Sequence, residues 1–148
     1  MAPEETALYF GLFNEIGIIE QLSRALLEAR LPEGLITPHF AVLNHLVRVR
    51  DGRTPLDLAR AFQVPKTSLT HTLAGLERRG LVALRPNPED GRSKQVWITA
   101  EGRALREQVI AAMVPTFDEI AQAFPPERAR GILPALTALR QILDAGRD

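Results

Sequence analysis

The sequence predicts a mainly α-helical protein with one small β-hairpin, an α+β fold. Residues 54–79 hold two short amphipathic patterns separated by Val64-Pro65, and a residue that precedes proline avoids helical geometry. Two short β-prone runs follow, around a polar tip. Longer helical patterns flank this segment on both sides. Together these observations predict a winged helix-turn-helix (residues 37–99, called the head below) between an N-terminal helix (residues 1–36) and C-terminal helices (residues 100–148).

The first helix is expected from about Glu4 to Ala29. Its apolar residues recur at spacings of four and three, which places them on one helical face: Leu8, Leu12, Ile16, Ile19, Leu22 and Leu26. Phe10 and Phe13 widen that face beyond what one core contact requires. An apolar face of this width, far from the head in the sequence, predicts a partner helix.

Two Thr-Pro pairs predict the starts of the next helices. Thr37-Pro38 and Thr54-Pro55 each offer a threonine N-cap followed by a proline that is already bent for the first turn. Asp51-Gly52, between these helices, predicts a turn. Pro65 is expected to open the following helix.

The helix from about Lys66 to Arg79 has two contrasting faces. Leu69, Leu73 and Leu76 are spaced to face inward, whereas small or polar side chains lie opposite: Thr67, His71, Ala74 and Arg78, flanked by Thr70 and Gly75. Short hydroxyl and imidazole groups can hydrogen-bond phosphates or base edges, and the small residues would let the backbone approach a surface closely. The alternative is an ordinary surface helix that happens to contain threonines.

The β-hairpin is expected from Leu81–Arg85 and Gln95–Thr99, with nine residues, PNPEDGRSK, as its tip. A basic hairpin beside such a helix can enter the minor groove, where arginine is attracted. Asp90 is expected to pair with Arg92 or a neighbouring arginine and so to fix its direction. The alternative is an ordinary charged hairpin.

The C-terminal part predicts two further helices. Thr99 is an N-cap candidate for a helix that runs to about Phe124, with a kink or break at Pro115. The last helix is expected from about Glu127 to Ala145, with a distortion at Pro134. The first and the last helix of the chain both carry apolar faces that have no obvious cover within one chain.

The formal net charge is zero, but the charges are segregated. Residues 48–94 hold ten basic and five acidic side chains, including both lysines, and the remainder holds eight basic and thirteen acidic ones. The middle of the chain is therefore expected to face a polyanion, against the alternative of chance clustering on solvated faces.

Several classes of protein are excluded by what the sequence lacks. There is no cysteine, hence no disulfide or thiolate metal site, and no apolar run approaches the ~20 residues that a membrane span requires. The acidic start lacks the pattern of a secretion signal, so we expect a cytoplasmic location. His39 and His45 are six residues apart and point in different directions on a helix, and no phosphate loop or nucleophile elbow is present. We expect neither an enzyme nor a cofactor or metal site.

Residues 37–105 carry the motifs of a known family. In order they read LAxxFxVPKTSLTxTLxxLERRGLV, RPNPEDGR with its Asp90-Gly91-Arg92 tip, and VWITAEGRAL. This order resembles the winged helix-turn-helix of the MarR family of transcriptional regulators. The chain departs from the family at Thr70-His71, where Thr-Arg is frequent, and at Leu84, where an arginine commonly starts the wing strand. These departures predict weaker or altered DNA recognition.

The resemblance implies a homodimer whose N- and C-terminal helices interlock, bound to a pseudo-palindromic site on double-stranded DNA. It implies a repressor that is often released by a small aromatic or anionic ligand. The residues expected to contact DNA are Lys66, Thr67, Ser68, Thr70, His71, Arg78, Arg85, Asp90, Arg92 and Lys94. Phe13, His39 and Leu43 are expected to line a ligand site. The alternative function is a winged-helix protein-interaction module without DNA binding.

Overall fold

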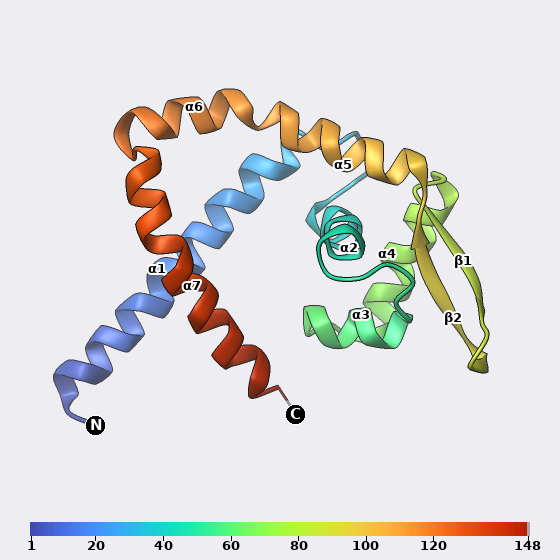
Figure 1. Ribbon diagram of the computed structural model, residues 1–148, viewed down its shortest axis with the longest axis horizontal. Coiled ribbons are helices and arrows are strands. Elements are labelled where there is room, and N and C mark those ends of the chain that lie inside the picture. The colour runs from blue at the N-terminus through green and yellow to red at the C-terminus, as the bar shows by residue number, and fades with distance from the viewer. Residues whose placement is uncertain (148) are drawn as a thin grey trace. The chain divides into compact units, whose positions relative to one another are not determined.

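The computed structural model describes residues 1–147 and confirms a mainly helical chain with one hairpin (Figure 1). The elements in chain order are α1 (Pro3–Glu28), α2 (Thr37–Arg48), α3 (Pro55–Phe62), α4 (Lys66–Arg78), β1 (Val82–Asn87), β2 (Asp90–Ile98), α5 (Ala100–Ala112), α6 (Val114–Ala123) and α7 (Pro126–Ala145). The chain divides into two compact units, residues 1–112 and the residues from 113 onward. Among residues 1–147, no helix combines the length and apolar character needed to cross a membrane.

The first unit has its core in the head. Leu43 and Leu46 of α2 pack with Leu58 of α3, Leu76 of α4 and Val96 of β2, and these five side chains are at most 2% exposed. Three short helices and one face of the hairpin thus share a single apolar interior. This packing stabilises α3, which at eight residues is too short to persist in isolation.

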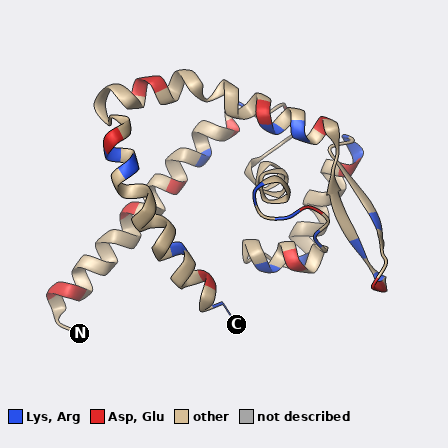
Figure 2. Ribbon diagram, in the orientation of Figure 1, with Lys and Arg blue, Asp and Glu red and all other residues tan. Residues whose placement is uncertain are grey.

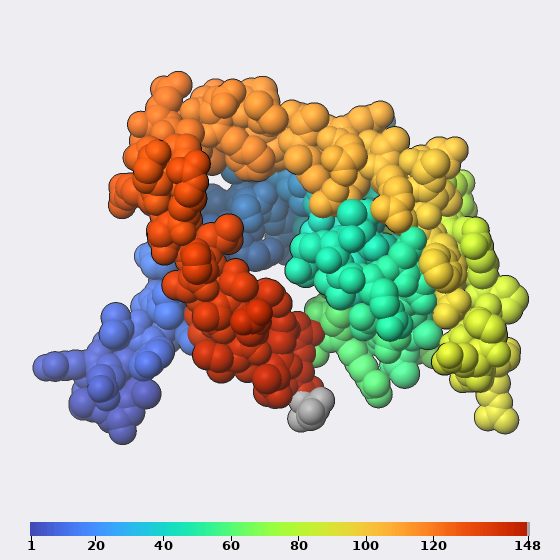
Figure 3. All heavy atoms as spheres, in the orientation of Figure 1, coloured from blue at the N-terminus to red at the C-terminus, as the bar shows by residue number. Residues whose placement is uncertain are grey.

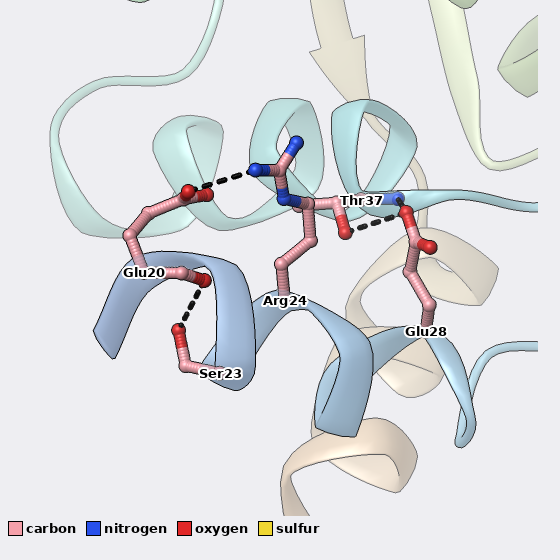
Figure 4. A network of polar contacts seen from close by, with 5 residues as sticks. All are labelled: Glu20, Ser23, Arg24, Glu28 and Thr37. Atoms are coloured by element: carbon pink, nitrogen blue, oxygen red, sulfur yellow. Dashed lines mark hydrogen bonds and ion pairs between the residues drawn. The ribbon is translucent and has the colours of Figure 1, made fainter. Parts of the chain in front are cut away.

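The two predicted threonine caps have different outcomes. Thr54 caps α3 as expected, because its Oγ1 accepts a hydrogen bond from the N–H of Asp57 at 3.1 Å. The assignment of Thr37 as N-cap was wrong, since Ile36 holds that position and Thr37 begins α2. Thr37 instead donates both its N–H and its hydroxyl to the Glu28 carboxylate of α1, at 2.9 and 2.8 Å (Figure 4). A carboxylate is a stronger acceptor for the unpaired N–H groups of a first helical turn than the threonine's own hydroxyl.

The turn between α3 and α4 confirms the predicted helix break. It consists of Gln63, Val64 and Pro65, and Gln63 adopts a left-handed backbone conformation with φ of 54°. Pro65 precedes the helix as its N-cap rather than opening it, so α4 starts at Lys66.

The hairpin is longer than predicted. β1 extends to Asn87 and β2 begins at Asp90, which leaves only Pro88 and Glu89 between the strands. The Asn87 side chain explains the difference, because its Nδ2 donates to Ser93 Oγ and its Oδ1 accepts from the N–H of Glu89, both at 3.0 Å. Polar tip residues thus continue the pairing that the apolar pattern alone does not predict. The tip projects from the surface of the head (Figure 3).

The predicted cap at Thr99 and the predicted break at Pro115 are confirmed. Thr99 Oγ1 accepts from the N–H of Gly102 at 3.0 Å and donates to the Gly80 carbonyl at 2.7 Å. The helix ends at Ala112, and α6 starts with Pro115 in its first turn. In the second unit α7 continues through Pro134 without ending there.

Candidate nucleic-acid interface

The outward face of α4 is the first half of the candidate interface. Leu69, Leu73 and Leu76 are buried as predicted. The side chains assigned to DNA from this helix are all exposed: Lys66, Thr67, Ser68, Thr70, His71 and Arg78. The burial of the three leucines and the exposure of these six side chains are therefore confirmed, whereas Ala74, also expected on the outward face, is half-buried.

Gly75 does not belong to that open surface. A Cβ at this position would lie 3.1 Å from Nε2 of His39, so Gly75 permits close packing between α4 and α2. The expectation that Gly75 helps the helix approach an external surface was wrong. Gly75 lies about 100° around the helix from the outward face, on the side of α4 that α2 covers.

Thr70 has a restricted hydrogen-bonding role. Its hydroxyl donates to the Lys66 carbonyl at 2.9 Å, within the same helix. The single hydroxyl proton is engaged, so the oxygen is left as an acceptor. Among base edges in the major groove it therefore suits the amino groups of adenine or cytosine.

The hairpin is the second half of the candidate interface. Arg85, Arg92 and Lys94 are exposed, and Figure 2 shows basic residues along both strands with acidic residues at the tip. Arg85 lies over the Trp97 ring, with its Cζ 5.8 Å from the ring centroid. Leu84, one residue earlier, packs against the core instead. The strand alternation thus sends Arg85 outward and Leu84 inward.

Asp90 holds Arg92 in a way the sequence did not indicate. Asp90 Oδ1 accepts a hydrogen bond from the backbone N–H of Arg92 at 3.0 Å, and within residues 1–147 the two side chains form no ion pair. The predicted ion pair was therefore wrong. A short aspartate reaches the amide two residues ahead more easily than a side chain that points away along the strand. Asp90 fixes the backbone of the tip and leaves the Arg92 guanidinium available.

The three residues expected around a ligand lie in different surroundings. Leu43 is 1% exposed in the core, whereas Phe13 on α1 is 45% exposed. His39 stands in the first turn of α2, where its Nδ1 accepts from the N–H of Ile36 at 3.0 Å. Burial lowers the pKa of His39 below its ordinary value of 6.5. Their shared role in binding a ligand stays a prediction.

Two features of the head were not predicted from the sequence. His45 is buried, with its ring edge-on to Phe62 at 5.3 Å, whereas the sequence indicates only its spacing from His39. Asp51, expected only in a turn, also accepts a hydrogen bond from the N–H of Ile98 at 3.0 Å. The partners in each contact lie far apart in the sequence, so no local pattern predicts either contact. The Asp51-Gly52 pair indicates only a turn.

Comparisons with known proteins agree with this geometry. The model of the MarR family matches residues 33–93. The chain is 32% identical over 118 residues to the transcriptional regulator HosA of Escherichia coli O111:H-, covering 80% of this chain and 83% of HosA. It is 36% identical over 102 residues to the transcriptional activatory protein BadR of Rhodopseudomonas palustris, covering 68% and 57% of the two chains.

One solved structure bears on the interface. The crystal structure of a mutant MarR from E. coli complexed with operator DNA is 25% identical to this chain, with a TM-score of 0.70. The match covers 87% of this chain and 93% of that chain.

Proposed function

Because this chain belongs to the MarR family of transcriptional regulators, we propose that it binds a pseudo-palindromic operator as a homodimer and represses transcription until a small ligand releases it. One observation carries the proposal: the exposed polar face of α4 and the basic hairpin are parts of one packed head. The similarity to a MarR structure that holds operator DNA supports the same function.

The two halves of the interface take different parts of the duplex. Lys66, Thr67, Ser68, Thr70 and His71 of α4 enter the major groove, where side chains read base edges. Arg92 at the hairpin tip enters the minor groove, and Asp90 keeps the Arg92 backbone in place. Arg78, Arg85 and Lys94 neutralise phosphates.

The helical ends support the homodimer. Helices α1, α6 and α7 contain no buried residue, yet each carries large apolar side chains, such as Phe10, Phe117 and Leu133. Exposed apolar faces of this kind mark interaction surfaces. Pairing of two chains would place two heads on half-sites about one helical turn apart, ~10 bp.

Release by a small ligand is the second part of the proposed function. A small aromatic or anionic compound would bind near Phe13, His39 and Leu43 and change the spacing of the two heads. BadR is named an activatory protein. Whether this chain represses or activates transcription is therefore a question for experiment. A reporter gene behind the selected operator would show repression if the proposal is correct and activation if it is not.

The first test is selection of bound duplexes from a random library, followed by binding titrations at several salt concentrations. We expect a palindromic consensus. Arg92→Ala should weaken binding and flatten the slope of log affinity against log salt by roughly one unit. Arg130→Ala on α7 is a matched control, because its side chain is 75% exposed outside the proposed interface.

The same titrations address the alternative function. A winged-helix module that binds only proteins would bind no duplex, even at low salt, and its affinity would show no salt dependence. An Arg92→Ala variant with wild-type affinity and slope would remove the hairpin from the interface.

A further inference from the structure

The hairpin is held on its second edge by the loop between α2 and α3. β1 pairs with one edge of β2, and on the other edge the N–H of Val96 donates to the Arg53 carbonyl at 2.8 Å. Successive N–H groups on one edge of a strand are two residues apart, so the N–H of Ile98 points toward the same loop.

At Ile98 a side chain takes the place of a backbone carbonyl. Gly52 has a left-handed φ of 69°, which turns the loop away from the strand after a single bridge. Asp51 Oδ1 then accepts from the N–H of Ile98 and from the N–H of Gly52, each at 3.0 Å. Asp51 Oδ2 faces Arg103 of α5 at 3.4 Å. One carboxylate thus joins the loop, the base of the hairpin and the following helix.

The turn also packs directly under the hairpin. A Cβ on Gly52 would lie 2.5 Å from Cζ2 of Trp97, so the loop backbone lies against the indole ring. Trp97 is the neighbour of Ile98 on β2, and Arg85 lies over the same ring. The base of the hairpin is therefore fixed by backbone pairing, by the Asp51 carboxylate and by ring packing.

We propose that Asp51 is a positioning residue for DNA binding, which sets the direction of the β1–β2 hairpin and thereby places Arg92 and Lys94. The inference rests on the proposed function, since it assumes that the hairpin touches DNA. Arg92 lies six residues before Ile98, which is roughly 20 Å along a strand. A pivot of about 10° at the base moves the tip by roughly 3 Å, enough to break a hydrogen bond to DNA.

A double-mutant cycle on the selected duplex tests this role. The variants are Asp51→Ala, the tip variant Arg92→Ala/Lys94→Ala, and their combination. We expect Asp51→Ala to weaken binding by roughly fivefold or more, the effect of one lost contact. The tip variant should weaken binding in the wild-type background and have little further effect in the Asp51→Ala background, because the tip is then already misplaced.

The sign of the effect separates positioning from simple electrostatics. Removal of an acidic side chain near DNA should by itself tighten binding. Asp57→Ala is the matched control, because it removes the same charge from the neighbouring helix α3, where the Asp57 carboxylate pairs with the Arg53 side chain at 3.8 Å and takes no part in the hydrogen bonds that hold Val96 and Ile98. Asp51→Asn keeps an acceptor oxygen for Ile98 and should retain most of the affinity. Full additivity in the cycle, unchanged affinity in Asp51→Ala, or a tip variant without effect on the wild-type protein would each overturn the proposal.

A measurement without DNA distinguishes this inference from the proposed function. Trp97 is the only tryptophan, so its fluorescence quenching by acrylamide reports on the hairpin base. Asp51→Ala should raise this quenching and speed hydrogen exchange at the Ile98 amide below the unfolding temperature, and Asp57→Ala should not. Unchanged exchange and quenching overturn the positioning role even if the wild-type protein binds DNA. If Asp51→Ala changes the exchange but the wild-type protein binds no duplex, the proposed function is wrong, and Asp51 is shown only to hold the base of the hairpin.

Discussion

The head and the helical ends carry similar amphipathic patterns but bury them very differently. In the head, Leu58 and Leu76 are both 0% exposed. In the ends, Phe10 of α1, Leu133 of α7 and Ile142 of α7 are 73%, 65% and 70% exposed. The short helices of the head cover one another because tight turns return the chain onto itself. The difference teaches that periodicity identifies an apolar face, whereas the connections decide whether the same chain covers it.

The largest expected effect is loss of a head side chain. Leu58→Ala should destabilise the protein by about 2–5 kcal/mol, because it leaves a cavity in a closed core. Leu56→Ala is the control on the same helix, since Leu56 is 48% exposed and its loss opens no cavity. Chemical denaturation of both variants measures the difference. Equal losses would break the contrast between buried and exposed apolar residues.

The ends should respond through association rather than folding. Phe10→Asp places a charge on the exposed apolar face of α1, and we expect the dissociation constant of the proposed dimer to rise by roughly 30-fold, the loss of one strong interface contact. Analytical ultracentrifugation measures this constant, and the tryptophan signal of the head should stay unchanged. If Phe10→Asp remains as dimeric as the wild-type protein, α1 does not form the interface.

Two glycines compare a site of α5 that packs against the head with an open site of α1, at the level of the backbone. A Cβ at Gly102 would lie 2.2 Å from the Leu81 carbonyl oxygen, so Gly102→Ala should cost about 1–3 kcal/mol through strain. Gly17 of α1 has nothing within 4 Å of the same position. Gly17→Ala should therefore stabilise the free chain by about 1 kcal/mol through helix propensity. Thermal unfolding of both variants should shift in opposite directions, and a tolerated Gly102→Ala would contradict the close packing of α5.

Acid should lower the folding stability of the head because His45 is held neutral in the folded protein. Burial lowers the pKa of His45 below its ordinary value of 6.5, and the nearby Arg53 and Arg48 charges act in the same direction. The unfolded chain therefore takes up a proton below about pH 6.5 that the folded chain refuses, so stability falls as pH drops through this range. His45→Gln should flatten the dependence of unfolding free energy on pH between about 5 and 7.

His39 provides an internal comparison for that experiment. Its pKa is also lowered by burial, so His39→Gln should flatten the same curve and the double variant should flatten it further. A wild-type curve with no slope between about pH 5 and 7 would mean that neither imidazole is held neutral by the fold.

The smallest effect concerns the junction of α1 and the head. Hydrogen bonds from Thr37 lower the pKa of the Glu28 carboxyl below its ordinary value of 4.5. The stabilisation that these two hydrogen bonds give the folded protein is therefore present above pH 4.5 and is lost as pH falls through the lowered pKa. Glu28→Gln should remove part of this acid dependence with little effect at neutral pH, because water still reaches the carboxylate. If the unfolding free energy of Glu28→Gln falls with acid as it does in the wild-type protein, this cap does not contribute to the acid dependence of stability.

Local signals explain which parts of the fold could be predicted. Thr54-Pro55 and Val64-Pro65 act within a few residues, so their cap and break follow directly from the sequence. The prediction of Thr37 as an N-cap was wrong because the group that accepts from the start of α2, the Glu28 carboxylate, belongs to another helix. The Asp51–Ile98 contact joins residues 47 positions apart, and no local pattern indicates it. The outward face of α4 was predictable because burial of three leucines fixes the opposite side of a helix.

The positions of the two lysines have a practical chemical consequence. Lys66 and Lys94 are the only lysines in the chain, and both are exposed within the candidate interface. Amine-directed reagents acylate side chains only there, so they remove positive charge from this surface and leave the side chains of the core and the helical ends untouched. The same chemistry used to couple the protein to a sensor chip would attach it by the face under study or by the α-amino group of Met1. Capture through a terminal tag keeps that face free.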